Sequence, residues 1–240
     1  MNHAFLSLPE VLHILELIES LHSVDSYSAG HSWRVSDYSL IMGEMLGLSE
    51  PELFYLFMGA VSHDIGKLKI PPHILQKPGK LTPEERNRVE KHSLFGKGEL
   101  ENNSLIPFIK NGILEHHERI DGSGYPLGLK GTEISLEGKI IAIADVYDAL
   151  TSIRPYRNPM SHSTAINYLF ENAGAHFDLS LVSLFATIPI EKISIIKEKI
   201  GDVHPLHLVN EKTTESKIFT AWSKIIEHPE ILNKKLINSL

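Results

Sequence analysis

The amino-acid sequence predicts an all-α fold. Three observations support this prediction. Apolar residues recur at spacings of three and four along most of the chain, helix-capping signals precede several of these runs, and segments rich in Gly and Pro separate them. The 240 residues, of which 42% are apolar, can bury the core of one domain. We expect a domain at 1–190 with a leading helix at 1–24, followed by a helical extension of unknown role at 191–240.

Two helices are expected before residue 48. The first carries apolar residues that we assign to one face: Val11, Leu12, Leu15 and Ile18. The second, GHSWRVSDYSLIMGEML, carries another such face: Val35, Tyr38 and Met42. Gly47 follows the second run and predicts its end.

Two helix starts with capping boxes come next. In SEPELFYLFMGAVSHDIG, Ser49 is the expected N-cap and Glu52 the residue that caps back. Apolar residues run almost all the way round this helix, so we expect it to be buried. The Pro- and Lys-rich segment KLKIPPHILQKPGK predicts a loop or a short irregular segment. After it, Thr82 and Glu85 frame another helix start.

The second half of the chain alternates loop and helix. DGSGYPLGLKG is rich in Gly and predicts a loop, and KIIAIADVYDALTS predicts a helix, although KIIAI alone would also fit a strand. SHSTAINYLFENAG predicts an amphipathic helix that ends at Gly174, and a further short helix is expected near Asp178. Beyond Glu191, EKISIIKEKIG and ESKIFTAWSKIIEHPEILNKKL indicate helices around a polar link.

Charge and composition exclude several classes of protein. The net charge of -7 argues against non-specific binding to DNA or RNA backbones, which needs a basic surface. The lack of Cys in the sequence excludes disulfides and thiolate metal sites. No run of 18 apolar residues predicts a spanning helix, and the N-terminal segment, interrupted by Glu, is a poor signal peptide. We therefore expect a cytoplasmic protein without a membrane span.

Clustered histidines carry the candidate chemistry. An isolated His-Asp pair is usually a chance dipeptide, but five His and two Asp fall on successive expected helices near apolar faces: His31, His63, Asp64, His92, His116, His117 and Asp145. Burial of so many unpaired polar groups would be costly, so the set favours a metal cluster. Imidazole with carboxylate suits Fe, Mn, Zn or Ni. Seven ligands suit two ions that share a bridging carboxylate, which predicts hydrolysis of a phosphate ester.

Ordered motifs connect this set to a known family. HDIGK, with His31 upstream and Asp145 downstream, resembles the HD superfamily of metal-dependent phosphohydrolases. HHERIDGSGYP resembles the HD-GYP subfamily, as do HSWRV, KIPPHILQKPGKLTPEE, ADVYDALTSIRPYR and AGAHFD, so the resemblance spans 25–178. It implies an HD-type helical bundle with an HD-GYP extension. The implied activity is that of a cyclic di-GMP phosphodiesterase in bacterial second-messenger signalling, with linear pGpG, GMP or both as products.

The resemblance also implies the roles of individual residues. One metal site would take His31, His63, Asp64 and Asp145, and the second would take His92, His116 and His117 with Asp64 bridging. The implied catalytic residues are Asp64 and Lys67, with a metal-bridging hydroxide as the nucleophile. The implied substrate contacts are Lys67, Tyr125, Arg154 and Arg157.

Several alternatives stay open at this point. Tyr125 would either stack on a guanine or pack within its loop, and the basic residues could be ordinary surface charges. Arg34 and Glu118 would either orient metal-bound histidines or make common salt bridges. The same chemistry could act on cyclic GMP-AMP. A further alternative is a nucleotide-binding or docking scaffold that acts through the GYP loop, the segment that contains Gly124, Tyr125 and Pro126.

The resemblance also sets the expected cofactors and partners. We expect two divalent metal ions, with Fe or Mn ranked before Zn or Ni. Some family members carry a Glu one helical turn before the first His, where it serves a third metal, but this chain has Tyr27 there, a poor ligand for a hard cation. The expected partners are the cyclic dinucleotide, diguanylate cyclase domains docked on the GYP loop, and a second copy of the chain in a homodimer.

Overall fold

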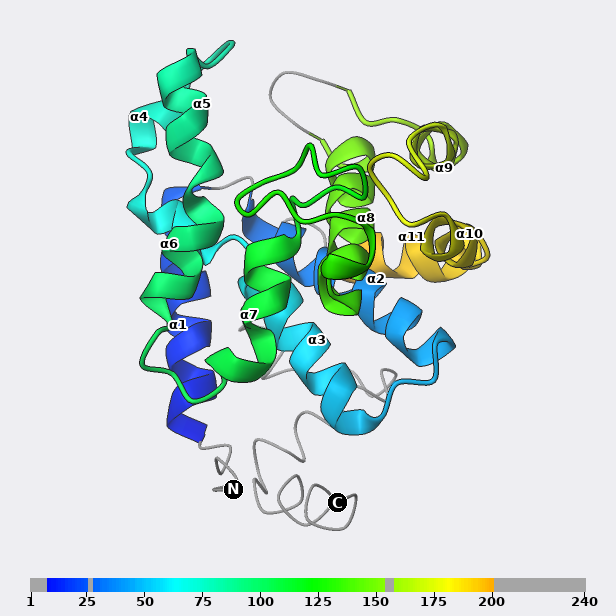
Figure 1. The fold of residues 1–240 in the computed structure, drawn as a ribbon, viewed down its shortest axis with the longest axis horizontal. Helices are drawn as coiled ribbons and strands as arrows, with labels where there is room; N and C mark the ends of the chain where they lie inside the picture. Colours follow the sequence, from blue (N-terminus) through cyan, green and yellow to red (C-terminus); the bar gives the residue numbers. More distant parts are fainter. Residues whose placement is uncertain (1–7, 26–27, 154–157, 201–240) are drawn as a thin grey trace.

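The computed structural model describes residues 8–25, 28–153 and 158–200, whose regular structure is helical (Figure 1). The predicted all-α class is therefore confirmed. The helices of the first half are α1 (Leu8–Val24), α2 (Ser28–Met45), α3 (Glu50–Ser62), the 3₁₀-helix η1 (Ile65–Lys69), α4 (Pro72–Leu75), α5 (Pro83–Glu90) and α6 (His92–Glu99). Those of the second half are α7 (Ile106–Glu115), the 3₁₀-helix η2 (Gly131–Glu133), α8 (Leu136–Thr151), α9 (His162–Glu171), α10 (Leu179–Phe185) and α11 (Ile190–Ile200).

Helix α3 lies inside the bundle and joins its two halves. It packs against α2 and α7, while α8 packs against both of these neighbours. Figure 1 shows α1 and α6 on one side of this group and α9, α10 and α11 on the other. Side chains of α3 belong to two buried apolar clusters, one shared with α2 and α8 and the other shared with α1 and α7. Packing in both clusters fixes where the C-terminal end of α3 lies.

The buried face of α1 differs in part from the predicted one. The buried apolar residues of this helix are Val11, Ile14, Ile18 and Leu21. Leu12 was expected on this face but is 45% exposed, so that assignment was wrong. Neighbouring residues on a helix point about 100° apart, so Leu12 turns away when Val11 packs inward. Spacings of three and four fit a buried face with Leu12 and also one with Ile14 and Leu21, and the helices that pack against α1 decide between the two faces.

The predicted helix boundaries are largely confirmed. The Glu52 carboxylate accepts hydrogen bonds from the backbone N–H and the hydroxyl of Ser49 at the start of α3. Thr82 and Glu85 form the predicted capping box of α5. Gly47 and Gly174 have φ values of 76° and 84°, which favour Gly after a helix. The Pro- and Lys-rich segment, predicted as a loop or a short irregular segment, contains the end of η1 and the four-residue helix α4. KIIAI is helical within α8.

Helix α11 packs against α2 and continues the core. Its residues Ile193 and Ile196 are buried in the cluster that contains α2 and α8. The domain boundary at 190 stays a prediction, and the helix expected after it lies outside the described residues. In the described part of the chain no single helix is long and apolar enough to cross a membrane. The bent pair of α10 and α11 has the combined length and composition for it.

Gly66 lets η1 approach α6 at backbone distance. A Cβ atom at position 66 would lie 1.9 Å from the carbonyl oxygen of His92 and 2.4 Å from the backbone nitrogen of Gly96. Both neighbours are main-chain atoms, so neither can move aside without shifting α6. The Gly in HDIGK is thus required by packing, and it places Asp64 beside the first turn of α6.

Gly66→Ala should therefore destabilise the protein by about 3 kcal/mol, because the overpacked methyl group must displace α6. Gly98→Ala is the matched control, since a Cβ there meets nothing within 4 Å. Gly98 lies within α6, so its replacement should change stability by less than about 1 kcal/mol and in the stabilising direction. Urea unfolding monitored by circular dichroism measures both values. Equal stability of the two variants would contradict the packing argument.

Candidate metal centre

The structure brings the seven predicted residues together from five parts of the fold. His31 lies on α2 and Asp145 on α8, while His63 and Asp64 follow α3. His92 begins α6, and His116 and His117 follow α7. The ligand atoms of His31, His63 and Asp64 lie within 4.8 Å of one another, and so do those of His92, His116 and His117. Asp145 completes the first group, because its Oδ1 is 3.2 Å from Nε2 of His31.

Three of these histidines bond to the last turn of the helix before them. Nδ1 of His63 lies 2.6 Å from the carbonyl oxygen of Ala60, and Nδ1 of His92 lies 2.7 Å from that of Val89. Nδ1 of His116 lies 2.8 Å from the carbonyl oxygen of Ile113. A carbonyl can only accept, so Nδ1 carries the proton in each ring and Nε2 keeps its lone pair. Final-turn carbonyls lack intrahelical partners, which makes them available for this role.

The free Nε2 atoms fit a bound cation. Nε2 of His63 is buried and has no hydrogen-bond partner in the described part of the chain. Nε2 of His92 and Nε2 of His116 face each other at 3.1 Å. Burial and neighbouring histidines lower the pKa of His116, and burial lowers that of His92, which disfavours a proton between the two lone pairs. Two nitrogens bound to one ion at about 2.1 Å lie roughly 3 Å apart, so the observed spacing suits a metal.

Asp64 lies between the two groups of residues. Its Oδ1 is 3.4 Å from Nε2 of His92, and its Oδ2 is 3.4 Å from Nε2 of His63. Lys67 donates to Oδ2 at 2.6 Å. Burial would raise the pKa of Asp64, but the charge of Lys67 outweighs burial and holds the pKa well below its usual range. The carboxylate therefore stays ionised and presents one oxygen to each group, as the predicted bridge requires.

Asp148 is a functional residue that the sequence analysis missed. It is fully buried, its Oδ2 lies 2.8 Å from Nδ1 of His31, and its Oδ1 accepts from Nε of Arg34 at 2.7 Å. Arg34 is thus both a salt-bridge partner and part of the support of His31. Burial opposes the charged form, but hydrogen bonds to Asp145 and Asp148 raise the pKa of His31 to about 9. Asp148 lies one helical turn after Asp145, and that spacing was the available signal.

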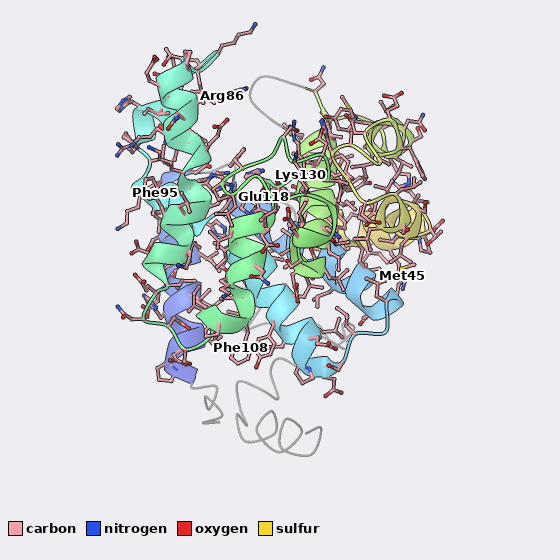
Figure 2. The ribbon with its side chains drawn as sticks, in the orientation of Figure 1. Met45, Arg86, Phe95, Phe108, Glu118 and Lys130 are labelled. Carbon is pink, nitrogen blue, oxygen red and sulfur yellow. The ribbon has the colours of Figure 1, made fainter. Side chains whose placement is uncertain are left out.

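The Gly-rich loop after α7 covers the side of the centre formed by His92, His116 and His117. The ring of Tyr125 lies 4.7 Å from that of His117 and 6.4 Å from that of His92, measured between centroids. Glu118 follows neither predicted alternative, since its carboxylate accepts from backbone N–H groups of this loop. Figure 2 shows Glu118 beside the loop. Arg154, Arg157 and Tyr27 lie outside the described residues, so their predicted roles stay predictions.

Comparisons with known proteins agree with this arrangement. The HD domain family model matches residues 16–181. The cyclic di-GMP phosphodiesterase response regulator RpfG of Xanthomonas campestris is 47% identical over 148 residues, covering 60% of this chain and 39% of the relative. The 3'3'-cGAMP-specific phosphodiesterase 3 of Vibrio cholerae is 40% identical over 152 residues, covering 63% and 33%. The chain spans about half or less of the length of such curated relatives.

A solved structure shares the fold. An HDG"Y"P protein from Bdellovibrio bacteriovorus matches with a TM-score of 0.55 at 19% identity, covering 72% of this chain and 66% of that one. At this level of identity the match supports the arrangement of helices. The predicted HD-type helical bundle is thereby confirmed.

Asp148→Asn should weaken metal binding at the half of the centre that contains His31. The amide keeps the size of the carboxylate but loses its charge and one acceptor, so it no longer satisfies both His31 and Arg34. Loss of such a supporting partner typically costs roughly 10- to 100-fold in metal affinity. Competition with a chromophoric chelator measures the effect. Asp178→Asn is the control, because Asp178 caps α10 and Asn keeps the cap. Equal affinity in the two variants would remove Asp148 from the centre.

Proposed function

This chain belongs to the HD-domain family, in its HD-GYP type, and from that premise we propose that it is a metal-dependent phosphodiesterase that hydrolyses a cyclic dinucleotide. One observation carries the proposal: Asp64 lies between two groups of histidines, and the Nε2 atoms of His63, His92 and His116 keep the lone pairs that can bind a cation. Two adjacent cation sites that share a carboxylate are an arrangement suited to phosphoryl chemistry.

The residues of the centre divide into two ligand sets. We assign one divalent ion to His31, His63, Asp64 and Asp145, and the other to His92, His116 and His117 with Asp64 shared. Such ions, when bound, activate water and neutralise charge on a phosphoryl group. Mixed imidazole and carboxylate donors favour Fe or Mn, with Zn or Ni as alternatives. Position 27 is Tyr and offers no carboxylate for a further ion, which supports two ions instead of three.

Lys67 supplies positive charge at the edge of this centre. Its side chain is 21% exposed and its ammonium group touches Asp64, so it is held close to the bridging carboxylate. Burial would lower the pKa of Lys67, but the charge of Asp64 raises it, and the group stays a cation. A fixed ammonium group there is suited to stabilise charge that develops on a phosphate oxygen. The ring of Tyr125 lies beside that of His117.

Cyclic di-GMP is the substrate that we favour, with pGpG, GMP or both as products. The Xanthomonas relative, at 47% identity, is named for this nucleotide. Cyclic GMP-AMP is the second candidate, because the Vibrio relative at 40% identity is named for it. A silent scaffold is the less favoured reading, since all seven residues of the centre are present and converge.

Asp64→Ala should lose metal and hydrolysis together. Without the shared carboxylate neither ligand set is complete, so metal analysis should fall from about two ions per chain towards none. Turnover should fall at least about a thousandfold, while helical circular dichroism persists. Mass spectrometry of metal content and chromatography of the products measure both effects. Normal hydrolysis by purified Asp64→Ala would refute the proposed mechanism.

Lys67→Ala, Arg154→Ala and Arg157→Ala should each weaken turnover without emptying the metal centre, because their predicted partners are substrate phosphates or bases. Loss of one charged hydrogen bond predicts roughly a tenfold effect on kcat/KM. Parallel assays with cyclic di-GMP and cyclic GMP-AMP give the substrate preference. Faster turnover of cyclic GMP-AMP would reverse our ranking of substrates. Unchanged kinetics in all three variants would make these residues ordinary surface charges.

A further inference from the structure

Glu118 is a buried carboxylate whose partners all belong to one loop. Only 3% of the residue is exposed. Its Oε1 accepts from the backbone N–H of Leu127 at 2.6 Å and of Gly128 at 3.1 Å, and its Oε2 accepts from that of Leu129 at 3.0 Å. In the described ranges no Lys or Arg forms an ion pair with it. The negative charge is therefore stabilised by main-chain dipoles of this loop.

The three donors form a concave anion site in the backbone. Consecutive N–H groups that point to one side, with a residue at positive φ, create such a site. Gly128, the middle donor, has a φ of 68°, which Gly adopts without strain. The anion that fills the site comes from the chain itself, at the residue that follows His117. Hydrogen bonds to a charged acceptor are stronger than neutral ones, so this contact holds the loop firmly.

The same loop is held closely at its other end. A Cβ at Gly124 would lie 2.5 Å from the Cα of Glu118 and 2.5 Å from the carbonyl oxygen of His117, so the two segments pack backbone to backbone. The N–H of Tyr125 donates to that carbonyl oxygen at 3.2 Å. These contacts set the ring of Tyr125 beside the ring of His117. Residues 124–129 are thus fixed on both sides of Tyr125.

We propose that Glu118 is a positioning residue, which fixes the GYP loop through residues 127–129 and thereby holds Tyr125 where substrate binds. The inference rests on the proposed phosphodiesterase function and on the predicted contact of Tyr125 with substrate. Glu118 makes no hydrogen bond to His116 or His117, so its loss leaves the ligand set intact. Its effect falls on substrate binding, which appears in KM more than in kcat.

Glu118→Gln tests the proposal with little change of volume. The amide oxygen of Gln can accept from part of the loop, but its NH₂ group faces an N–H donor and repels it. We expect unchanged metal content and roughly a tenfold rise in KM for cyclic di-GMP with Mn²⁺, the size of one lost charged hydrogen bond. Amide hydrogen exchange across 124–129 should quicken. These two readouts do not depend on each other.

Glu133→Gln is the matched control. Glu133 is exposed, lies at the end of the same loop and accepts from a single N–H, that of Lys130. Its substitution removes the same charge without touching 127–129. We expect KM and exchange across 124–129 to stay at wild-type values. Equal effects of the two variants on KM and exchange would show that charge alone matters, and would overturn the proposal.

A double-mutant cycle with Tyr125→Ala separates positioning from general damage. If Glu118 acts through Tyr125, Glu118→Gln should add less than about twofold to KM once the ring is gone. Fully additive effects of the two substitutions on KM would overturn the proposal. Loss of metal from Glu118→Gln, or unchanged amide hydrogen exchange across 124–129 in this variant, would also overturn it. Wild-type protein without turnover on any cyclic dinucleotide would instead contradict the proposed function. Loop exchange and metal content would still decide whether Glu118 fixes the loop.

Discussion

The candidate centre depends on one interaction, the hydrogen bond from a histidine Nδ1 to a carbonyl in the last turn of a helix. It occurs after α3, after α5 and after α7. Each bond uses a carbonyl in the final turn of a helix and fixes the tautomer that can bind a cation. The packing that places these helix ends therefore also places His63, His92 and His116. Helix packing and metal chemistry are two consequences of the same geometry.

Charge is the second constraint on this interior. Asp64, Asp145 and Asp148 bring three carboxylates into the bundle, and Arg34 and Lys67 bring two permanent cations. Buried charges are tolerated when they are paired and hydrogen-bonded. Burial lowers the pKa of His117 to about 3, so this ring adds no positive charge. The carboxylates of Asp64 and Asp145 and the Nε2 lone pairs of His63, His92 and His116 together favour a divalent cation.

The sequence predicted the fold class, most helix boundaries and the seven converging residues, because each has a local signal. Capping boxes act within four residues, and the His-Asp motifs lie at expected helix ends. The prediction for the buried face of α1 was wrong at Leu12, since the elements that pack against this helix are not encoded locally. Glu118 was misjudged because its partners are main-chain N–H groups, which have no sequence signature. Asp148 was missed although it lies one turn from Asp145.

The end of α7 explains why these parts form one unit. Glu115 accepts from the backbone N–H of Ser135 and so connects α7 to the start of α8, the helix that carries Asp145. His116 and His117 face the centre, and Glu118 holds the loop that carries Tyr125. The four successive residues 115–118 thus connect α8, the group of His92, His116 and His117, and the loop that carries Tyr125. A shift of α7 would move all three together, so the rigidity of this helix end sets the geometry of the whole centre.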